Sequence, residues 1–355
     1  MENRVLRLRD EMGRLNLDAV LIEESKNKRY ISGFTGTAGS IIITKEKCIL
    51  FTDFRYTQQA KNQTNGFEII EISRTNPLTN FLKEMDIKRL GFEDDKMSFA
   101  TYINYKENLI NTEMVPLKGL MLNLRAVKDE NELNIIRQAA KIADNGFMHI
   151  IDFIKPGMKE SEVALELEFF MRKQGASGAS FDFIVASGKR SSMPHGVASD
   201  KIIEVGDFIT IDFGCVYNGY CSDMTRTIVV GKANDKQKEI YNIVLEAQLK
   251  VIEHAKANMT GIELDNIARQ YIIEKGYGDK FGHGLGHGIG LDVHELPNVN
   301  ALGANILKPN MVISDEPGIY IEDFGGVRIE DLLIITEDGC EVINSSPKEL
   351  IELEF

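Results

Sequence analysis

ITIDFGCVYNGYCSD, residues 209–223, places two acidic side chains at the mouth of one predicted hairpin. The apolar run 208–211 predicts a buried strand ending at Asp212, the Gly, Tyr and Asn residues after it predict a turn, and a second strand begins at Asp223. A buried carboxylate is costly unless a cation or a hydrogen-bond donor meets it. The two acids therefore indicate a shared positive charge, for which a metal ion is the simplest candidate. The alternative is that Asp212 caps a turn and Asp223 lies in solvent.

The chain repeats this arrangement near its C-terminal end. MVISDEPG, residues 311–318, is again an apolar strand that ends in an acid, Glu316, with a glycine two residues later. A further strand, GVRIEDLLII (326–335), carries Glu330 in an apolar setting. The sequence therefore predicts two acid-bearing hairpins.

The segments before the two hairpins are also related. PGM at 156–158 and NM at 258–259 each precede a helix-like run, at an offset of 101 residues, and His195 and His294 follow at an offset of 99. This order indicates an internal duplication of helices plus a hairpin. Two such halves facing each other bring four carboxylates to one point, which is a geometric argument for a two-metal site.

Composition limits the class of protein. A chain of 355 residues suggests two domains. With 43% hydrophobic and 27% charged residues it is an ordinary globular protein, and a net charge of −13 argues against a nucleic-acid surface. The four cysteines show no CxxC pair and the N-terminus has no apolar signal core, so we expect reduced thiols and a cytoplasmic location.

The first part of the chain, residues 1–122, reads as a small α/β domain. An amphipathic helix at 3–16, a strand at 18–23 and a hairpin at 40–52 begin an alternation of strands and helices. No catalytic constellation is found there. DFRY at 53–56 is its one dense polar cluster, and we interpret it as a structural turn.

The second domain is predicted to span residues 123–355, after a boundary near 119–126. It opens with apolar residues at helical spacing over 129–154. Asp129 has a glutamate three residues later, as has Thr260 before a helix of the second half, and both pairs predict capping boxes. The second half therefore follows the plan of the first.

A histidine cluster lies between the helices and the last hairpin of the second half. FGHGLGHGIGLDVHE, residues 281–295, contains His283, His287 and His294. Its alternating glycines are too dense for a helix or a packed strand and fit a backbone that passes very close to something. A lone histidine is more often a core or surface residue than a ligand. Three beside four carboxylates, with His195 in the other half, predict a site for metal binding and acid–base chemistry.

These residues together resemble the pita-bread metallopeptidases, in the aminopeptidase P and prolidase branch. The resemblance rests on Asp212 and Asp223 eleven residues apart and on HGIGLDVHE, DEPGIY and GGVRIED. GFTGTAGS (33–40) and TDFRY (52–56) are similar to a creatinase-like N-terminal domain. The implied fold is α+β, a C-terminal pita-bread domain with an internal pseudo-two-fold repeat after an N-terminal α/β domain.

The resemblance also implies roles for individual residues. The implied ligands of two divalent metal ions are Asp212, Asp223, His287, Glu316 and Glu330. His195 and His294 match substrate-facing histidines, Arg328 matches a supporting arginine, and Glu316 suits proton transfer. Carboxylates and one imidazole, without a thiolate, suit Mn²⁺ best, with Co²⁺, Zn²⁺ or Fe²⁺ as alternatives. A homodimer whose partner's N-terminal domain helps to close the site is implied as well.

The expected activity is hydrolysis of the Xaa-Pro bond, releasing the first residue from peptides with proline in second position. Prolidases similar to this chain have an arginine where Asn298 stands, four residues after His294, and a dipeptide's carboxylate calls for such a cation. This favours longer peptides, with an Xaa-Pro dipeptidase as the alternative. A non-enzymatic peptide-binding module or a creatine-type hydrolase would lack ligands that are all present here. A methionine aminopeptidase would lack the creatinase-like domain.

Overall fold

The computed structural model describes residues 2–355. The chain separates into two compact units, one ending at Arg125 and the other spanning Ala126–Phe355, and each is described by itself. Among residues 2–355, none of the helices combines the length and the apolar character that crossing a bilayer requires.

The N-terminal unit is built on one six-stranded mixed sheet with the strand order β4-β3-β2-β1-β5-β6. The strands are β1 (Ala19–Ile22), β2 (Ser40–Thr44), β3 (Cys48–Thr52), β4 (Glu68–Glu71), β5 (Arg89–Phe92) and β6 (Glu113–Pro116). The helices are α1 (Glu2–Arg14), α2 (Ser25–Ser32), α3 (Thr57–Gln63), α4 (Leu78–Glu84), α5 (Phe99–Asn108) and α6 (Leu120–Ala126). This alternation confirms the predicted α/β domain.

Helix α2 was not expected, because its sequence SKNKRYIS has no apolar repeat at helical spacing. Its N-terminus is capped by Glu24, whose carboxylate accepts from the backbone N–H of Asn27 at 2.7 Å. Its C-terminus ends at Gly33, which has a left-handed φ of 80°. Caps and burial, not periodicity, define this helix.

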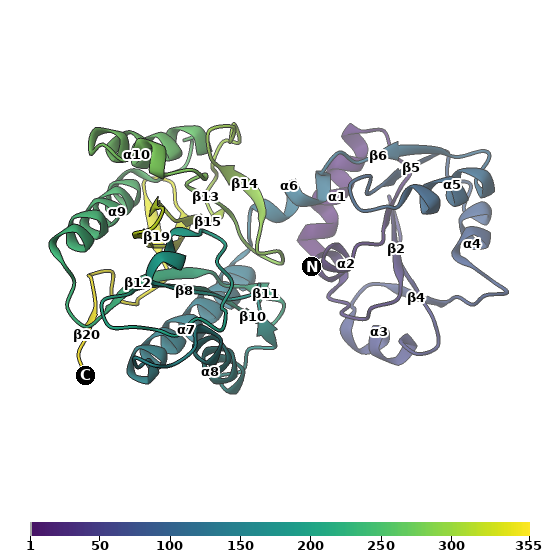
Figure 1. Ribbon diagram of the computed structural model, residues 1–355. Coiled ribbons are helices and arrows are strands. Elements are labelled where there is room, and N and C mark those ends of the chain that lie inside the picture. The colour runs from purple at the N-terminus through teal and green to yellow at the C-terminus, as the bar shows by residue number, and fades with distance from the viewer. Residues whose placement is uncertain (1) are drawn as a thin grey trace. The chain divides into compact units, whose positions relative to one another are not determined.

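The C-terminal unit contains the two related halves. The helices are α7 (Glu130–Phe153) and α8 (Glu160–Lys173) in the first half, and α9 (Asp235–His254) and α10 (Gly261–Glu274) in the second. Figure 1 shows the strands between these two helix pairs. The separate apolar cores of the halves, one formed with α7 and α8 and the other with α9 and α10, agree with this arrangement.

Each half contributes its own sheet. The first has the order β20-β12-β9-β8 and the second β14-β13-β15-β18-β19. The first sheet comprises β8 (Ile184–Ser187), β9 (Phe208–Phe213), β12 (Met224–Val230) and β20 (Glu352–Leu353). The second comprises β13 (Gly286–Gly288), β14 (Glu295–Val299), β15 (Val312–Asp315), β18 (Asp331–Ile335) and β19 (Cys340–Val342). The smaller sheets are formed by β7 (Gly178–Ala179), β10 (Cys215–Tyr217) and β11 (Tyr220–Cys221), and by β16 (Gly318–Ile321) and β17 (Gly325–Arg328).

Both predicted capping boxes are present. Asp129 Oδ1 accepts from the N–H of Glu132 at 3.0 Å, and the Glu132 carboxylate accepts from the N–H of Asp129 at 2.9 Å. Thr260 and Glu263 make the equivalent pair of bonds at the start of α10. Each box satisfies backbone donors that a helix start otherwise leaves unpaired.

Two strand predictions need correction. Asp212 does not end its strand, because β9 continues through Phe213. The stretch 326–335 is not one strand but β17 and β18, in different sheets, with Glu330 between them. The reason is a tertiary contact: the N–H of Glu330 donates to the carbonyl oxygen of Thr225 in β12 at 3.0 Å, which draws the chain out of the ladder.

Two of the alternating glycines, Gly286 and Gly288, face neighbouring strand backbones. A Cβ on Gly286 would lie 2.1 Å from the Ser314 carbonyl oxygen, and one on Gly288 would lie 2.2 Å from that of Leu296. Both distances are far below van der Waals contact, so β13 fits between β14 and β15 only without side chains at these positions. The glycines on either side of His287 therefore allow the strand that carries this histidine to lie close to both of its neighbours.

Candidate active site

Acidic side chains from both halves converge with one histidine. Asp223 lies just before β12, Glu330 just before β18, and His287 in the middle of β13. One ligand atom from each of these three residues lies within 4.8 Å of the others. Asp212 and Glu316 line the same cavity. The hairpins predicted from sequence therefore meet at one point.

Three carboxylate oxygens of this cluster are buried without a hydrogen-bond partner among the described residues: Asp212 Oδ1, Asp223 Oδ1 and Glu330 Oε1. Burial raises the pKa of Asp223 well above its usual range, and the nearby Glu330 raises it further. Burial likewise raises the pKa of Glu330. Unpaired buried anions of this kind need a cation. Oxygen ligands with one imidazole fit a divalent ion, so the donor set agrees with the metal chemistry expected from sequence.

Glu316 and His287 form an ion pair within the cluster. Glu316 Oε1 lies 3.2 Å from His287 Nε2 and accepts from the Ser314 hydroxyl at 3.0 Å. Burial acts to raise the pKa of Glu316, but the hydrogen bond and charge of His287 lower it to about 2. Burial acts to lower the pKa of His287, and Glu316 outweighs it and raises that pKa. His287 therefore lowers the pKa of Glu316, whereas burial raises those of Asp212, Asp223 and Glu330.

Arg328 supports Asp212 from the back of the cavity. Its Nη2 lies 2.5 Å from Asp212 Oδ2, and its Nη1 donates to the Tyr320 hydroxyl at 2.7 Å. Tyr320 lies 2.9 Å from Nε2 of His283, whose Nδ1 lies 2.7 Å from the Gly284 carbonyl oxygen. Because that oxygen can only accept, Nδ1 carries the proton and Tyr320 donates to Nε2. Sequence reasoning missed Tyr320, since nothing in its position within β16 indicates this contact.

The pKa values of His283 and His294 are both lowered, which favours the neutral imidazole in each. Burial lowers the pKa of each, and the neighbouring charge of His287 lowers that of His294 further. The rings of His287 and His294 meet edge to face, with centroids 4.3 Å apart. His287 therefore lies in the acidic cluster, while His283 and His294 lie beside it.

A cavity of about 380 Å³ lies at the centre of this site. Every site residue predicted from sequence lines it: His195, Asp212, Asp223, His287, His294, Glu316, Arg328 and Glu330. Phe181, Ile184 and Val197 supply an apolar wall. Asn298 is exposed on β14 and is not part of the lining. Asn300, two residues later, is.

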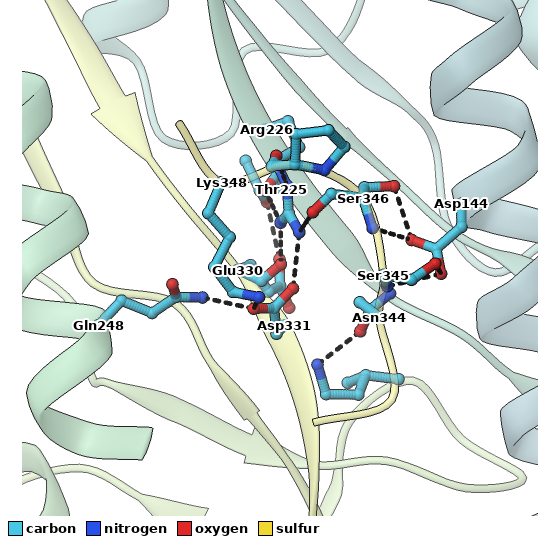
Figure 2. Close-up of polar contacts among 12 residues, drawn as sticks. Asp144, Thr225, Arg226, Gln248, Glu330, Asp331, Asn344, Ser345, Ser346 and Lys348 are labelled. Carbon is cyan, nitrogen blue, oxygen red and sulfur yellow. Dashed lines mark hydrogen bonds and ion pairs between the residues drawn. The ribbon is translucent and has the colours of Figure 1, made fainter. Parts of the chain in front are cut away.

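Glu330 is held from two sides by consecutive residues of β12. The Thr225 hydroxyl donates to Glu330 Oε2 at 2.7 Å, and Arg226 Nη1 donates to the Glu330 carbonyl oxygen at 2.6 Å. Figure 2 shows these two hydrogen bonds and the polar network next to them. Thr225 was also missed, although the acid at 223 and the hydroxyls at 225 and 227 follow the two-residue period of one strand face.

The network behind Glu330 centres on Asp331, which has no solvent exposure. It accepts from Arg226 at 2.7 Å, from Gln248 at 3.0 Å and from Lys348 at 2.8 Å (Figure 2). These partners come from β12, α9 and the C-terminal segment. The residue next to Glu330 is therefore tied to both halves of the domain.

Comparisons with known proteins identify the family of both units. The profile of metallopeptidase family M24 matches residues 134–337, and that of the creatinase/prolidase N-terminal domain matches residues 4–127. A Xaa-Pro dipeptidase of Pyrococcus horikoshii is 44% identical, over 99% of both chains.

Two solved structures are similar as well. The Xaa-Pro dipeptidase from Bacillus anthracis has 51% identity and a TM-score of 0.96 over 99% of both chains. The X-Pro aminopeptidase from Thermotoga maritima has 42% identity and a TM-score of 0.90, over 96% of this chain and 99% of that one. With its acid cluster, its pseudo-symmetric halves and its N-terminal unit, this chain belongs to metallopeptidase family M24, in the branch that carries a creatinase/prolidase N-terminal domain.

Proposed function

We propose that this hydrolase cleaves the Xaa-Pro bond of dipeptides. The observation that carries the metal-dependent hydrolysis is the set of partnerless buried oxygens on Asp212, Asp223 and Glu330 beside His287. The comparisons favour the dipeptidase alternative over the aminopeptidase that the sequence favoured, because the similar Pyrococcus and Bacillus proteins are named Xaa-Pro dipeptidases. The argument against dipeptides relied on Asn298, which lies outside the cavity lining.

Family membership implies divalent metal ions, and we propose Mn²⁺ as the resident ion. The proposed ligands are Asp212, Asp223, His287, Glu316 and Glu330. Divalent ions held there supply Lewis acidity and make water nucleophilic at neutral pH. Oxygen-rich ligand sets with one imidazole suit Mn²⁺ better than thiolate-preferring ions.

The chain's own residues divide the remaining work. Glu316, which lines the cavity, accepts the proton of the attacking water and returns it to the leaving nitrogen. His294 and His195, which both line the cavity, donate hydrogen bonds to the scissile carbonyl as negative charge develops. Arg328 keeps Asp212 in place through its 2.5 Å contact.

The apolar wall explains tolerance of proline. Phe181, Ile184 and Val197 line the cavity next to Pro194, and a pyrrolidine ring has no N–H that such a wall would leave unpaired. We further propose that residues 123–355 form the catalytic domain, and that the protein is a homodimer in which the partner's N-terminal domain helps to close the cavity.

The test is kcat/KM, with Mn²⁺ present, for an Xaa-Pro dipeptide, the Xaa-Pro-Yaa tripeptide with the same first residue, and the matching Xaa-Ala dipeptide. We expect the Xaa-Pro dipeptide to be the best substrate. A preference for the tripeptide would overturn the dipeptidase assignment in favour of an aminopeptidase. A preference for Xaa-Ala would overturn the proline specificity, and no hydrolysis of any of them would favour a peptide-binding module.

A further inference from the structure

Two buried carboxylates that the proposed reaction does not use each hold one of the histidine-bearing loops. Glu160 is the first residue of α8 and Asp265 lies in the second turn of α10, and neither has any solvent exposure. These are the corresponding helices of the two halves. We propose that Glu160 and Asp265 are positioning residues, the first for a substrate-facing histidine and the second for a metal ligand. The inference rests on the proposed function, because it takes the roles of those histidines from it.

Glu160 holds both ends of the segment that contains His195. Its Oε1 accepts from the N–H and the hydroxyl of Ser187 at 2.7 and 2.8 Å. Its Oε2 accepts from the N–H and the hydroxyl of Ser199 at 3.2 and 2.7 Å. Arg190, inside the segment, also forms an ion pair with Glu160. One side chain therefore closes the loop 188–198 at its base.

The place of His195 depends on this loop. Among the described residues no hydrogen bond to the His195 imidazole is found, so the backbone sets the ring's position. Two contacts inside the loop transmit the restraint. Arg190 Nη2 donates to the Val197 carbonyl oxygen at 2.9 Å, and the N–H of Val197 donates to the His195 carbonyl oxygen at 2.9 Å. Loss of the Glu160 charge would therefore release the ring without touching a metal ligand.

Asp265 holds the glycine-rich segment by a similar device. It accepts from the N–H of Leu285 at 2.9 Å and pairs with Arg269, one turn later in α10, at 2.6 and 2.9 Å. Arg269 in turn donates to the carbonyl oxygens of Phe281 and His283 at 2.9 and 2.7 Å. Three alternate backbone groups are thus fixed just before β13, which carries His287.

The two anchors therefore predict different consequences. An amide in place of Glu160 points a donor at serine and arginine donors, which leaves buried groups unpaired. The loop 188–198 carries no proposed metal ligand, so only catalysis should suffer. The segment held by Asp265 leads directly to His287, so metal binding should suffer there. If the two carboxylates had a purely structural role, substituting either one would lower stability, but Glu160 would not affect catalysis selectively and Asp265 would not affect metal binding selectively.

The first experiment compares Glu160→Gln with Glu162→Gln, a control on the exposed face of the same helix turn. We expect Glu160→Gln to keep the Mn²⁺ affinity measured by calorimetric titration and to lower kcat/KM for an Xaa-Pro dipeptide by about 10- to 100-fold, the usual cost of an outer partner. Ser199→Ala, a milder change, should lower it less. If Glu160→Gln does not fold, Ser199→Ala carries the test.

Coupling to His195 decides the positioning role. Combining Glu160→Gln with His195→Ala should give a loss well below the product of the single losses, whereas combining it with His294→Ala should be multiplicative. If the losses of kcat/KM in Glu160→Gln and His195→Ala multiply in the double variant, the positioning role of Glu160 is overturned while the proposed function stands. If His195→Ala by itself leaves kcat/KM unchanged, the proposed role of His195 fails and the inference falls with it.

The second experiment compares Asp265→Asn with Glu263→Gln, the exposed capping residue that corresponds to Glu162. We expect Asp265→Asn to weaken Mn²⁺ binding by about 10- to 100-fold, and Arg269→Lys to weaken it in the same direction. Unchanged Mn²⁺ affinity in a folded Asp265→Asn or Arg269→Lys variant would overturn the role of this anchor.

Discussion

The hydroxyl of Thr225 lies 2.7 Å from Oε2 of Glu330. Arg328 Nε lies 3.1 Å from the same hydroxyl and can only donate, and an ionised Glu330 can only accept, so Thr225 donates to Glu330 when that carboxylate is ionised, as a metal ligand must be. Oε1 of Glu330 is then the oxygen left for the acidic cluster, where it is buried without a partner among the described residues. Thr225 thus selects the face that Glu330 presents to a metal ion.

Replacing Thr225 by valine should weaken metal binding. Valine keeps the shape but removes the donor, and we expect Mn²⁺ affinity to fall by about 10- to 100-fold. Thr225→Ser should retain the affinity. The matched control is Thr210→Val: Thr210 is also buried, and within residues 2–355 its hydroxyl bonds only to Thr227 and the Gly326 carbonyl oxygen. Calorimetric titration of the metal-free proteins measures the effect, and equal affinities in Thr225→Val and wild type would refute it.

Removing the metal should abolish hydrolysis. A chelator should eliminate Xaa-Pro cleavage, and Mn²⁺ or Co²⁺ should restore it. Bound ions should also raise the melting temperature, because at a concentration of about 100 times Kd they add about 2.7 kcal/mol to the free energy of unfolding. Full activity in a preparation that elemental analysis shows to be metal-free would end the proposed mechanism.

Substitutions should distinguish residues that bind the metal from residues that contact the substrate, because only the first group should lose metal together with activity. Asp223→Asn and Glu330→Gln should lose metal and activity together. His294→Ala should retain the metal while kcat/KM falls by about 100-fold, the scale of losing one donor to a developing oxyanion. Elemental analysis beside steady-state kinetics distinguishes the classes, and metal loss in His294→Ala would assign it to the wrong one.

The two histidines of the glycine-rich segment offer a second separation. His287 lies 3.2 Å from Glu316, whereas His283 bonds to Tyr320. We expect His287→Ala to lose metal and His283→Ala to retain it. The reverse result would show that the ligand assignment is wrong.

Stability of the metal-free protein should depend on pH through Glu330. Burial raises its folded pKa well above that of an unfolded carboxyl group. Its stabilising contribution is therefore complete below the unfolded pKa and is lost as pH rises towards the folded pKa. A glutamine at position 330 does not titrate. The free energy of unfolding of metal-free Glu330→Gln, relative to that of the metal-free wild type, should therefore be more favourable at pH 8 than at pH 4. Chemical denaturation at both pH values measures the difference, and a pH-independent difference would contradict the raised pKa.

Sequence alone determined the features that depend on short-range patterns. The meeting of the acids around Asp212 and Asp223 could be predicted because carboxylates in apolar strand segments are costly without a cation, while the full ligand set was implied by the family resemblance. The capping box at Thr260 follows from residue types three positions apart, and the N-terminal α/β alternation follows from periodicity. The repeat of the two halves followed from the order of such elements.

Only the tertiary structure decided which side chains support the site. Glu160 contacts Ser199 across 39 residues and Thr225 contacts Glu330 across 105, so no local pattern marks either pair. The same holds for the separation of β17 from β18 and for the position of Asn298 outside the cavity lining. Burial creates these constraints: once a polar group leaves water it must find its partner wherever the fold brings one, and that partner is fixed by packing in space rather than by spacing along the chain.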